Sequence, residues 1–468
     1  MKFKWVIMKK KLILYILFGF TIMVSSCSIT KPYEAPVIGK QDLYRDQSST
    51  DTTSIASLHW TEIFSDTLLQ NLTREGIDNN LDLKIAFSRI QQAQSYFEQS
   101  RLAFIPGLNA NVSTLNGKQS NTKNATSSTS ANVYQLNVNA SWEADLWGKL
   151  KSSKRAALAS LLQSEAYSRA VQTNLVAGIA NYYYNMQGLD QELKITEESV
   201  RNWISTVNIM KALKEADVVT EAAVVQSEAS RYAAEVTIPD LKQSIRMTEN
   251  ALSILLGRSP GPIQRSTLNA QKPVTLLNTG VPAQLLSNRP DVQEAELNFR
   301  YNFELANVAR TYFYPDFTIS ASGGFSGVSI STLFSPASLV GSVAGGLAQP
   351  IFNQGINKTR LKVAKEGQYQ ALLSFQNIVL TAGQEVSDDM ASYQSTIEKT
   401  SLRDSQIVNL QKAVEYTQLL VRYSSANYTE VLTAQQSLLS AQLSQVNDRL
   451  QQLQSIVNLY RDLGGGWK

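Results

Sequence analysis

The stretches RLAFIP at residues 101–106 and RTYFYP at residues 310–315 share the pattern Arg-x-x-Phe-x-Pro, 209 residues apart. Each stretch ends a segment whose apolar residues recur at helical spacing. Pro106 and Pro315 are expected to end these helices, because proline lacks a backbone donor and clashes with the preceding turn. The sequence therefore predicts the same helix-to-strand junction twice in one chain.

After each proline the apolar residues change to a period of two. In residues 135–142 (QLNVNASW) apolar side chains alternate with Gln, Asn and Ser, and residues 317–325 repeat this alternation. Such a pattern is typical of a β-strand with one apolar face. Weaker strands are expected at residues 107–116 and 337–349. Solvated loops are expected at residues 118–131 and 326–335, so that each half contains one hairpin.

Long helices fill most of each half. A first helix is expected over residues 60–101, and residues 149–215 contain no proline. Within residues 149–215, apolar residues follow steps of four and three with one polar gap at Thr196, the 3.5-residue period of coiled coils. The predicted seam comprises Leu175, Ile179, Tyr182, Met186, Leu189, Leu193, Val200, Trp203, Val207 and Met210. Helices of about 65 residues would each be about 100 Å long.

The two halves form a tandem duplication. The first half closes at LLG (255–257) and the second at DLG (462–464). Three prolines and two glycines mark residues 259–281 as a linker. The expected division is a signal at 1–26, an extended segment at 27–59, one repeat at 60–258, the linker, and a second repeat at 282–468.

The first residues predict export. Residues 1–11 carry five lysines and no acid, and a short apolar run follows at residues 12–24. This arrangement is typical of a secretory signal, and the run is too short to span a bilayer. Cys27, the single cysteine, follows Val-Ser-Ser as in the lipobox of bacterial lipoproteins. We therefore expect a covalent lipid at Cys27, with several acyl chains that give stable anchoring.

Composition argues against several functions. Loss of the five signal lysines lowers the formal charge from +4 to about −1 (4 minus 5), so a nucleic-acid partner is not expected. One histidine and one lipidated cysteine leave no His/Cys metal cluster. The chain has no G-x-S-x-G motif and no Gly-rich phosphate loop. We expect no enzyme, no metal site and no cofactor beyond the lipid.

Two hairpins supply only four strands, which cannot close a barrel, and open strand edges are not tolerated in hydrocarbon. Closure must therefore come from other copies of the chain. Two copies would give eight strands around a filled interior, and three would give twelve around an aqueous lumen. Aromatic residues gather at the predicted junctions, where a membrane-interface belt belongs. They are Phe104, Trp142, Trp147, Phe313, Tyr314 and Phe352.

Several motifs together resemble the TolC-like outer membrane efflux protein family, in its lipoprotein branch. They are the lipobox, the two Arg-x-x-Phe-x-Pro stretches, WEADLWGK (142–149), NRPDVQEAE (288–296), NYTEVLTAQ (427–435) and LGGGW (463–467). The resemblance implies a mainly α chain with a membrane β-barrel portion. It implies a homotrimer in outer membrane lipid, with a twelve-stranded barrel and a twelve-helix periplasmic tunnel. Its partners would be a periplasmic adaptor (a membrane fusion protein) and an inner-membrane pump, often of the resistance-nodulation-division type.

The resemblance also places the candidate gate. Helix–helix turns near residues 216–221 and 424–430 would lie at the periplasmic end, where acidic residues ring the narrowed pore. Glu430 matches the acidic position of the family motif, and Glu221 and Asp217 are further candidates in the first turn. Relatives usually carry glycine in both turns, and this chain carries none there. Glycine normally supplies the positive φ of such turns.

The expected function is a passive exit duct for drugs or other small compounds in a tripartite efflux pump. The exit duct of a type I protein-secretion system would use the same fold with another inner-membrane partner. A lipid-anchored coiled-coil scaffold or adhesin would explain the heptads and Cys27. It would not explain two alternating hairpins at matching points of a duplication.

Overall fold

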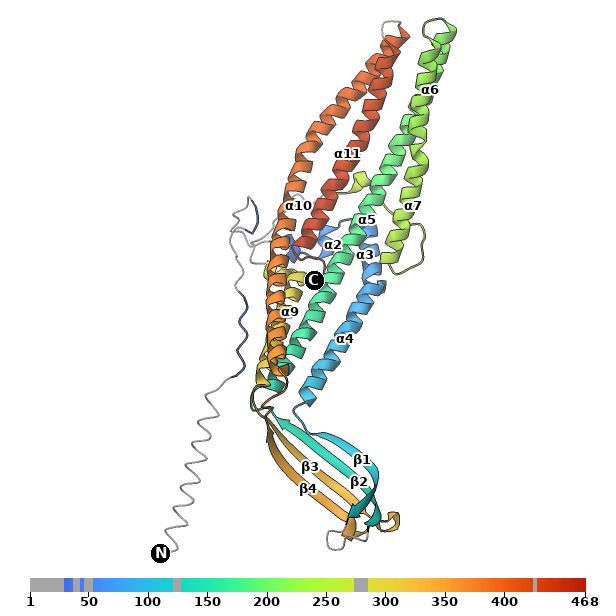
Figure 1. Cartoon of the computed structure of the whole chain (residues 1–468). Helices are drawn as coiled ribbons and strands as arrows, with labels where there is room; N and C mark the ends of the chain where they lie inside the picture. Colours follow the sequence, from blue (N-terminus) through green and yellow to red (C-terminus); the bar gives the residue numbers. More distant parts are fainter. Residues whose placement is uncertain (1–28, 37–42, 46–53, 121–127, 273–284, 424–426) are drawn as a thin grey trace. The chain divides into compact units, whose positions relative to one another are not determined.

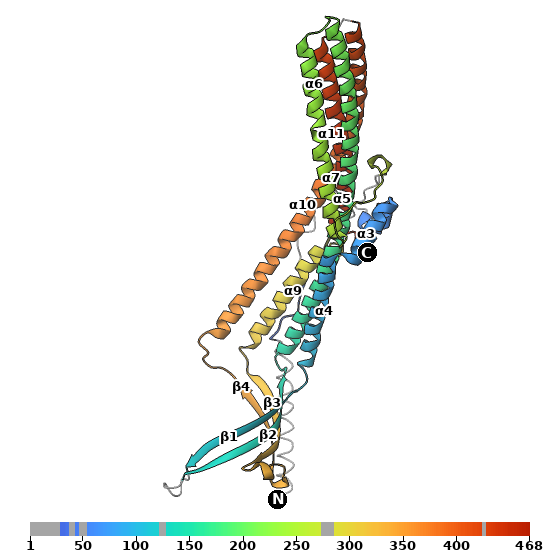
Figure 2. The same cartoon turned by 90° about the vertical axis from the view of Figure 1, so that its right-hand side faces the viewer.

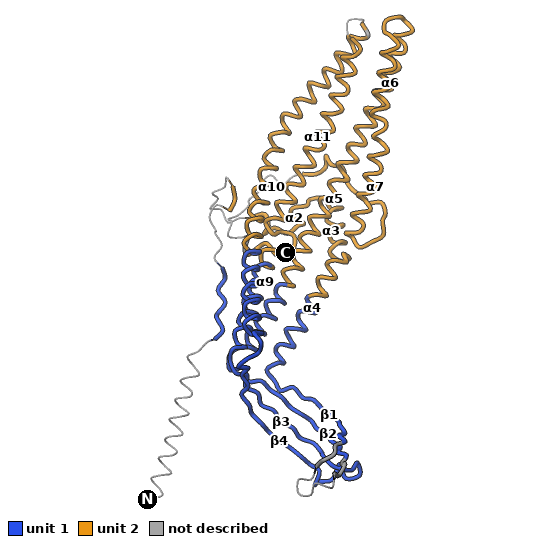
Figure 3. The backbone as a smooth tube through the Cα atoms, in the orientation of Figure 1, with its two compact units in different colours: residues 1–37, 90–163, 295–375 blue, residues 38–89, 164–294, 376–468 orange. Residues whose placement is uncertain are grey.

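The computed structural model describes residues 29–36, 43–45, 54–120, 128–272, 285–423 and 427–468. The predicted signal and Cys27 lie outside these ranges. The chain forms two compact units, shown in Figure 3. Unit 1 comprises residues 1–37, 90–163 and 295–375, and unit 2 comprises residues 38–89, 164–294 and 376–468. Each unit therefore contains residues from both halves of the sequence.

Helices and strands follow the predicted order along the chain (Figure 1). The α-helices are α2 (Trp60–Ile63), α3 (Thr67–Asn79), α4 (Leu81–Leu102), α5 (Lys149–Glu215), α6 (Glu221–Glu235), α7 (Thr237–Leu255), α8 (Leu285–Asn288), α9 (Pro290–Thr311), α10 (Ile356–Arg422) and α11 (Tyr428–Asp462). The strands are β1 (Gly107–Ser120), β2 (Ser128–Ala144), β3 (Asp316–Gly327) and β4 (Leu339–Ala348). Short 3₁₀ turns are η1 (Ile55–Ser57), η2 (Leu268–Ala270), η4 (Ile330–Thr332) and η5 (Pro336–Ser338).

Unit 1 contains one antiparallel sheet in the order β1-β2-β3-β4 (Figure 1). The register aligns Val112, Leu136, Phe325 and Leu339 in one apolar row. It aligns Asn109, Asn139, Ser322 and Ser342 in a polar row, and these rows face opposite sides because successive side chains alternate. The four predicted strands are confirmed. The loop prediction was wrong at residues 118–120, 128–131 and 326–327, where ladder pairing extends the strands beyond the alternating pattern.

Unit 2 contains a bundle of long helices, seen side by side in Figure 2. Near the turns, Met210 of α5, Val224 of α6, Val421 of α10 and Val431 of α11 pack into one apolar cluster. Farther along, Val200 and Trp203 of α5 form a second cluster with Ala234 of α6 and Leu432 of α11. The seam prediction is therefore confirmed over this part of α5.

One position of the seam was predicted incorrectly. Tyr182 is 39% exposed, whereas the next residue, Tyr183, is fully buried. The Tyr183 hydroxyl donates to Asp66 Oδ2 at 2.7 Å and accepts from the Ser266 backbone N–H at 3.0 Å. Because these polar partners, remote in sequence, satisfy the hydroxyl of Tyr183, this residue is buried in place of Tyr182, which the apolar periodicity predicted.

The single helix expected over residues 60–101 is three helices, and this prediction was wrong. Asp66 caps α3 by accepting from the Leu68 backbone N–H at 2.9 Å. Asn80 ends α3 in an extended conformation, and its side chain accepts from the Leu83 N–H in the first turn of α4. Asp and Asn compete with the helical backbone in this way and so favour helix boundaries.

The return helix of the first half is also divided, into α6 and α7, with Val236 between them. Pro239 lies in the first turn of α7. Proline removes one backbone donor and its ring clashes with the carbonyl four residues earlier, here that of Glu235, the last residue of α6. The return helix of the second half has no such proline, and α11 continues over 35 residues.

The duplication is visible in matching contacts. Gly257 and Gly464 end their helices with φ of +68° and +90°. A Cβ on Gly257 would overlap the backbone carbonyl of Asn79, and a Cβ on Gly464 would overlap that of Asn288. Asn79 and Asn288 are separated by the same 209 residues as the opening stretches. Each half thus closes with a glycine packed on the backbone of an equivalent asparagine.

The next residue repeats the correspondence. Asn80 Nδ2 donates to the Leu255 carbonyl at 2.9 Å, and Arg289 Nη1 donates to the Asp462 carbonyl at 3.1 Å. These carbonyls belong to the last turns of α7 and α11, where helical acceptors lack intrahelical donors. The second half uses a charged group where the first uses an amide, and this difference creates the polar site described below.

Candidate functional site

The two prolines lie at equivalent helix-to-strand junctions in unit 1. Helix α4 ends four residues before Pro106 and α9 ends four residues before Pro315, as expected from the clash of each ring with that carbonyl. Hydrogen bonds between residues three apart then replace the helical spacing of four. They join Ile105 N to Leu102 O at 3.1 Å and Tyr314 N to Thr311 O at 3.0 Å. Strands β1 and β3 follow immediately. The predicted junctions are confirmed as local structure.

The two junction tryptophans each donate to a backbone carbonyl of a junction stretch. Trp142 Nε1 donates to the Phe104 carbonyl at 3.0 Å, and Trp147 Nε1 donates to the Pro315 carbonyl at 2.7 Å. The Trp147 ring lies 5.4 Å from that of Tyr314. Each indole therefore satisfies a carbonyl of one Arg-x-x-Phe-x-Pro stretch while its ring contributes apolar surface.

The remaining junction aromatics are partly or largely exposed. Phe313 and Tyr314 are each 40% exposed, and Phe352 is 86% exposed. Rings with this combination of apolar area and exposure are typical of membrane interfaces. Their role as an interfacial belt stays a prediction.

In unit 2, the first helix–helix turn has the hydrogen bonds of a Schellman cap. Val218 N donates to Leu213 O and Asp217 N donates to Lys214 O, both at 2.9 Å. Asp217 occupies the left-handed position with φ of +56°. The turn therefore keeps the backbone geometry that glycine usually provides, although an aspartate stands there.

Two ion pairs connect α5 and α6 beside this turn. Lys211 Nζ lies 2.7 Å from Glu228 Oε1, and Lys214 pairs with Glu221. The hydrogen bond and charge of Lys211 lower the pKa of Glu228, and those of Glu221 raise the pKa of Lys214. Glu221 is therefore a paired carboxylate in this chain.

Glu430 has a different environment. Asn427 caps α11 by accepting from the Thr429 backbone N–H at 3.1 Å, which places Glu430 in the exposed first turn. Val431 and Leu432, the next two residues, are buried. Among the described residues, Glu430 forms no ion pair, and a negative charge is stabilised at this end of a helix. The gate roles of Glu430, Glu221 and Asp217 stay predictions.

We expect Asp217→Gly to raise the free energy of unfolding by about 0.5–1 kcal/mol. Glycine removes the strain of a side chain at positive φ, a gain reduced by the greater freedom of glycine in the unfolded chain. Thermal unfolding of the purified protein measures the change. Asp217→Ala is the matched control, since it removes the carboxylate and keeps the strain. Equal stabilisation by both variants would show that φ is not the cause.

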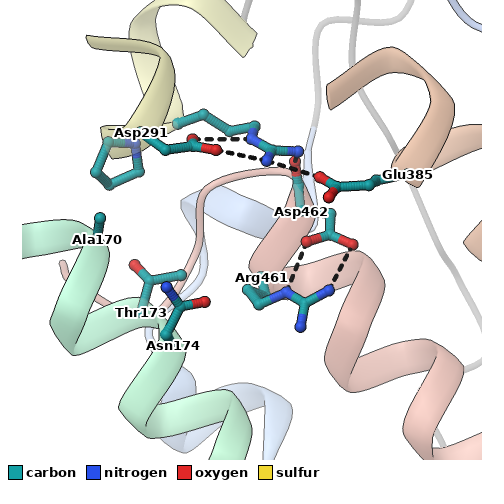
Figure 4. Close-up of a pocket in the computed structure, with 9 residues that line it drawn as sticks. Ala170, Thr173, Asn174, Asp291, Glu385, Arg461 and Asp462 are labelled. Carbon is teal, nitrogen blue, oxygen red and sulfur yellow. Dashed lines mark hydrogen bonds and ion pairs between the residues drawn. The ribbon is translucent and has the colours of Figure 1, made fainter. Parts of the chain in front are cut away.

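Another polar site in unit 2 is a pocket of about 310 Å³, shown in Figure 4. Its lining includes residues 289–291 of the motif NRPDVQEAE (288–296) and the last two residues of α11, Arg461 and Asp462, which directly precede LGGGW (463–467). Arg289, only 7% exposed, is the central group. It makes a bidentate pair with Asp291 at 3.0 and 2.7 Å and lies 2.7 Å from Glu385 Oε2. Burial alone would lower the pKa of Arg289, but Asp291 and Glu385 outweigh it and raise that pKa.

The end of α11 adds a second pair. Arg461 holds the buried Asp462 carboxylate at 2.6 and 2.9 Å (Figure 4). Asp389, one turn after Glu385 on α10, faces Asp462 within hydrogen-bonding distance. Burial, followed by the Asp462 carboxyl, raises the pKa of Asp389 to about 8. We call Arg289, Asp291, Glu385, Asp389, Arg461 and Asp462 the Arg289 cluster.

The sequence analysis identified the two motifs and missed Glu385 and Asp389. Both lie inside the 67-residue helix α10, where many polar residues occupy similar positions. The available signal was their spacing of four, which places both carboxylates on one helix face. That spacing is common on solvated helices, so it could not single them out.

The described N-terminal segment, residues 29–36, is held against α9 in unit 1. Asn307, fully buried, contacts the Lys31 backbone twice: Oδ1 accepts from the N–H and Nδ2 donates to the carbonyl, both at 3.0 Å. The Tyr33 ring lies 5.6 Å from Phe303, and its hydroxyl donates to Glu296 Oε1 at 3.2 Å. The segment is thus held against α9 by Lys31 and Tyr33, four and six residues after the predicted lipid site.

Two negative findings concern the described ranges only. No three His, Cys, Asp or Glu side chains within them form a group that could hold a metal ion. No helix within them combines the length and the apolar composition needed to cross a membrane.

Comparison with known proteins adds independent evidence. A curated relative, the probable efflux pump outer membrane protein TtgC of Pseudomonas putida, is 29% identical over 457 residues, which cover 95% of this chain and 94% of that protein. The cation efflux system protein CusC of Escherichia coli is 27% identical over 459 residues, covering 96% and 98%. Alignment thus extends over nearly the full length of both relatives.

Solved structures share the fold. The outer-membrane channel OprN matches with a TM-score of 0.88 at 24% identity, covering 94% of this chain and all of that one. A CusC structure matches with a TM-score of 0.84 at 25% identity, with the same coverage. The family model for outer membrane efflux proteins matches residues 72–258 and 281–465, most of the chain. The resemblance seen in the motifs is confirmed: this chain belongs to the TolC-like outer membrane efflux protein family.

Proposed function

We propose that the chain forms a homotrimeric exit duct that passively conducts drugs or other small compounds across the outer membrane. The observation that carries the proposal is the four-stranded sheet with one apolar face. In the order β1-β2-β3-β4, β1 and β4 each have a single described partner strand. Hydrocarbon does not tolerate open edges, and three sheets joined edge to edge make twelve strands around an aqueous lumen.

The exposure of the sheet supports a lipid-facing side. Val112 and Val343 are 82% and 80% exposed in the single chain. Side chains of this kind are stable on the outer face of a membrane barrel, with the Asn and Ser rows toward the lumen. Trp142, Trp147 and Phe313 then serve as interfacial anchors beside the junctions.

A lipid on Cys27 would complete the anchoring. The contacts of Lys31 and Tyr33 with α9 support this proposal, because they hold the chain close to the cysteine in the unit that contains the sheet. Several acyl chains on one residue give stable membrane attachment. The proposed division keeps a signal at 1–26, a segment at 27–59, two repeats at 60–258 and 282–468, and the linker between them.

We further propose a periplasmic adaptor and an inner-membrane pump as partners. Relatives named for an efflux pump and for a cation efflux system support this assignment. The duct itself would perform no chemistry and would need no cofactor. Energy and substrate choice would come from the pump.

Glu430 is the proposed gate residue. Threefold symmetry would bring three such carboxylates together at the periplasmic entrance. At about 6 Å and an effective dielectric constant near 20, each pair repels by about 2–3 kcal/mol. Such a ring favours cation binding and opposes a constricted state. The exposed position of Glu430 at the start of α11, where it forms no ion pair with the described residues, supports the proposal.

Planar-bilayer recording of the purified protein tests both the duct and the gate. We expect stable conductance, blocked by multivalent cations from the periplasmic side. Glu430→Gln should raise the half-blocking concentration by about threefold or more, because the ring loses its charge. Glu366→Gln is the matched control, with the same change of charge at an exposed position of α10 in unit 1.

The two parts of the proposal fail separately. Absence of conductance from a correctly folded trimer would contradict the duct. Normal conductance with unchanged block in Glu430→Gln would remove Glu430 from the entrance and leave the duct in place. Equal effects of the α10 control would show that net charge, and not this position, governs block.

A further inference from the structure

The Arg289 cluster contains more acidic than basic groups. Its two guanidinium groups, Arg289 and Arg461, face four carboxyl groups from α9, α10 and α11. Asp291 and Glu385 pair with Arg289, and Arg461 holds both oxygens of Asp462. The fourth carboxyl group, that of Asp389, forms no ion pair with a guanidinium of the described residues.

Asp389 also lacks an ordinary donor. Its Oδ2 atom is buried, and no N–H or O–H of the described chain donates to it. Its neighbour across the helix interface is the carboxyl of Asp462, which is 4% exposed. The Asp389 residue as a whole is half-buried. Two carboxyl groups facing each other in this setting are stable when one proton lies between them, because the protonated group then donates to the other.

Other charged groups near α10 do not replace that proton. Residues 43–45 pack along this helix, and the Arg45 backbone N–H donates to Ser387 Oγ at 3.1 Å. The charge of Arg461 lowers the pKa of Asp389 and that of Glu385 raises it, and both effects follow burial and the contact with Asp462. Thr173 and Asn174 of α5, which line the same pocket, are uncharged.

We propose that Asp389 and Asp462 form a proton-binding site that holds α10 against the C-terminal end of α11. One proton, shared by the two carboxyl groups, is the ligand. Release of that proton leaves two negatively charged carboxylates in contact, one buried and one half-buried, which weakens the attachment of α10 to the segment that leads into LGGGW (463–467). The site responds to the pH of the solution around these helices and is independent of the proposed conduction pathway.

The direction of the pH effect follows from the raised pKa. The folded chain keeps this proton up to about pH 8, whereas an unfolded aspartate loses it near 3.8. Between these values the folded state binds one more proton, so its stability falls as pH rises and levels off above about 8. Because the two carboxyls titrate as a pair, the proton belongs to both.

Infrared difference spectroscopy of the full-length protein between pH 5 and 9 tests the site. We expect a carbonyl band of a protonated carboxylic acid that disappears near pH 8. Asp389→Asn should remove this band, and Asp388→Asn, an exposed neighbour on α10, should retain it. In thermal unfolding, the equilibrium constant for unfolding of the wild type should rise by up to tenfold for each pH unit of the window, and Asp389→Asn should remove this slope.

A control separates the site from other buried acids. Burial also raises the pKa of Glu192, so Glu192→Gln is recorded to subtract its band. A band that survives Asp389→Asn overturns the proposal. If that variant does not fold, the Glu192→Gln spectrum decides: a midpoint above pH 6 supports the shared proton, and a midpoint below pH 6 or no band overturns it.

Discussion

Replacing Arg289 by alanine is expected to lower the free energy of unfolding by about 3–5 kcal/mol. The guanidinium is buried and serves Asp291, Glu385 and the Asp462 carbonyl at once. Removal of the buried guanidinium leaves the buried end of α11 without this donor. It also leaves the Asp291 and Glu385 carboxylates, 41% and 37% exposed, without their cation. The midpoint of thermal unfolding in detergent and the yield of folded protein measure the loss.

Arg289→Lys should recover only part of the stability, because a single ammonium cannot reproduce the bidentate contact with Asp291. Arg258→Ala is the matched control. Arg258 pairs with Glu75 at 3.0 Å, but its side chain is 40% exposed, so the expected cost is below about 1 kcal/mol. Similar losses for Arg258→Ala and Arg289→Ala would mean that burial of the network contributes nothing.

The second large effect is expected at the glycines that close the two halves. Gly257→Ala and Gly464→Ala should each lower the free energy of unfolding by about 2–5 kcal/mol. Both positions have positive φ, and a Cβ at Gly257 would lie 2.5 Å from the Asn79 carbonyl oxygen. The expected cost combines backbone strain with forced movement of a packed backbone.

Gly355→Ala separates these two contributions. Gly355 has φ of +82°, and a Cβ there would meet no atom within 4 Å. We expect only the strain, about 1–2 kcal/mol. Thermal unfolding of the three variants gives the comparison. If Gly355→Ala costs as much as the closing glycines, close packing on the asparagine backbone is not what requires glycine.

Some elements could be predicted from short stretches of sequence. The helix predicted over residues 149–215 has those bounds in the structure, and all four strands follow the predicted prolines. These features depend on the backbone chemistry of proline and on the spacing of apolar residues within a few turns. The class of protein could also be predicted from the sequence, because the motifs that resemble the efflux family are short stretches of neighbouring residues.

Other elements depended on partners far away in the chain. Tyr183 replaced Tyr182 in the buried seam because Asp66 and Ser266 satisfy its hydroxyl. The predicted helix over residues 60–101 is interrupted at Asn80, whose amide reaches the Leu255 carbonyl at the far end of the repeat. A periodicity count contains no information on such contacts.

The candidate sites divide in the same way. Asp217, Glu221 and Glu430 were found by position in a family motif, yet the Lys214 pair that distinguishes Glu221 from Glu430 needed coordinates. Asp389 was not identified at all. Its pKa depends on burial and on Asp462, a residue on another helix.

Residue order alone thus specified that long helices alternate with two hairpins, that Pro106 and Pro315 follow the ends of helices, that the pattern occurs twice, and which family the chain resembles. Those properties arise from backbone constraints and hydrophobic spacing over a few neighbouring residues. Folding in three dimensions brought Arg289 to the Asp462 carbonyl across 173 positions and placed Asp389 beside a second carboxyl group. Charge pairing and proton affinity depend on the groups within a few ångströms, and only the packed chain defines those neighbours.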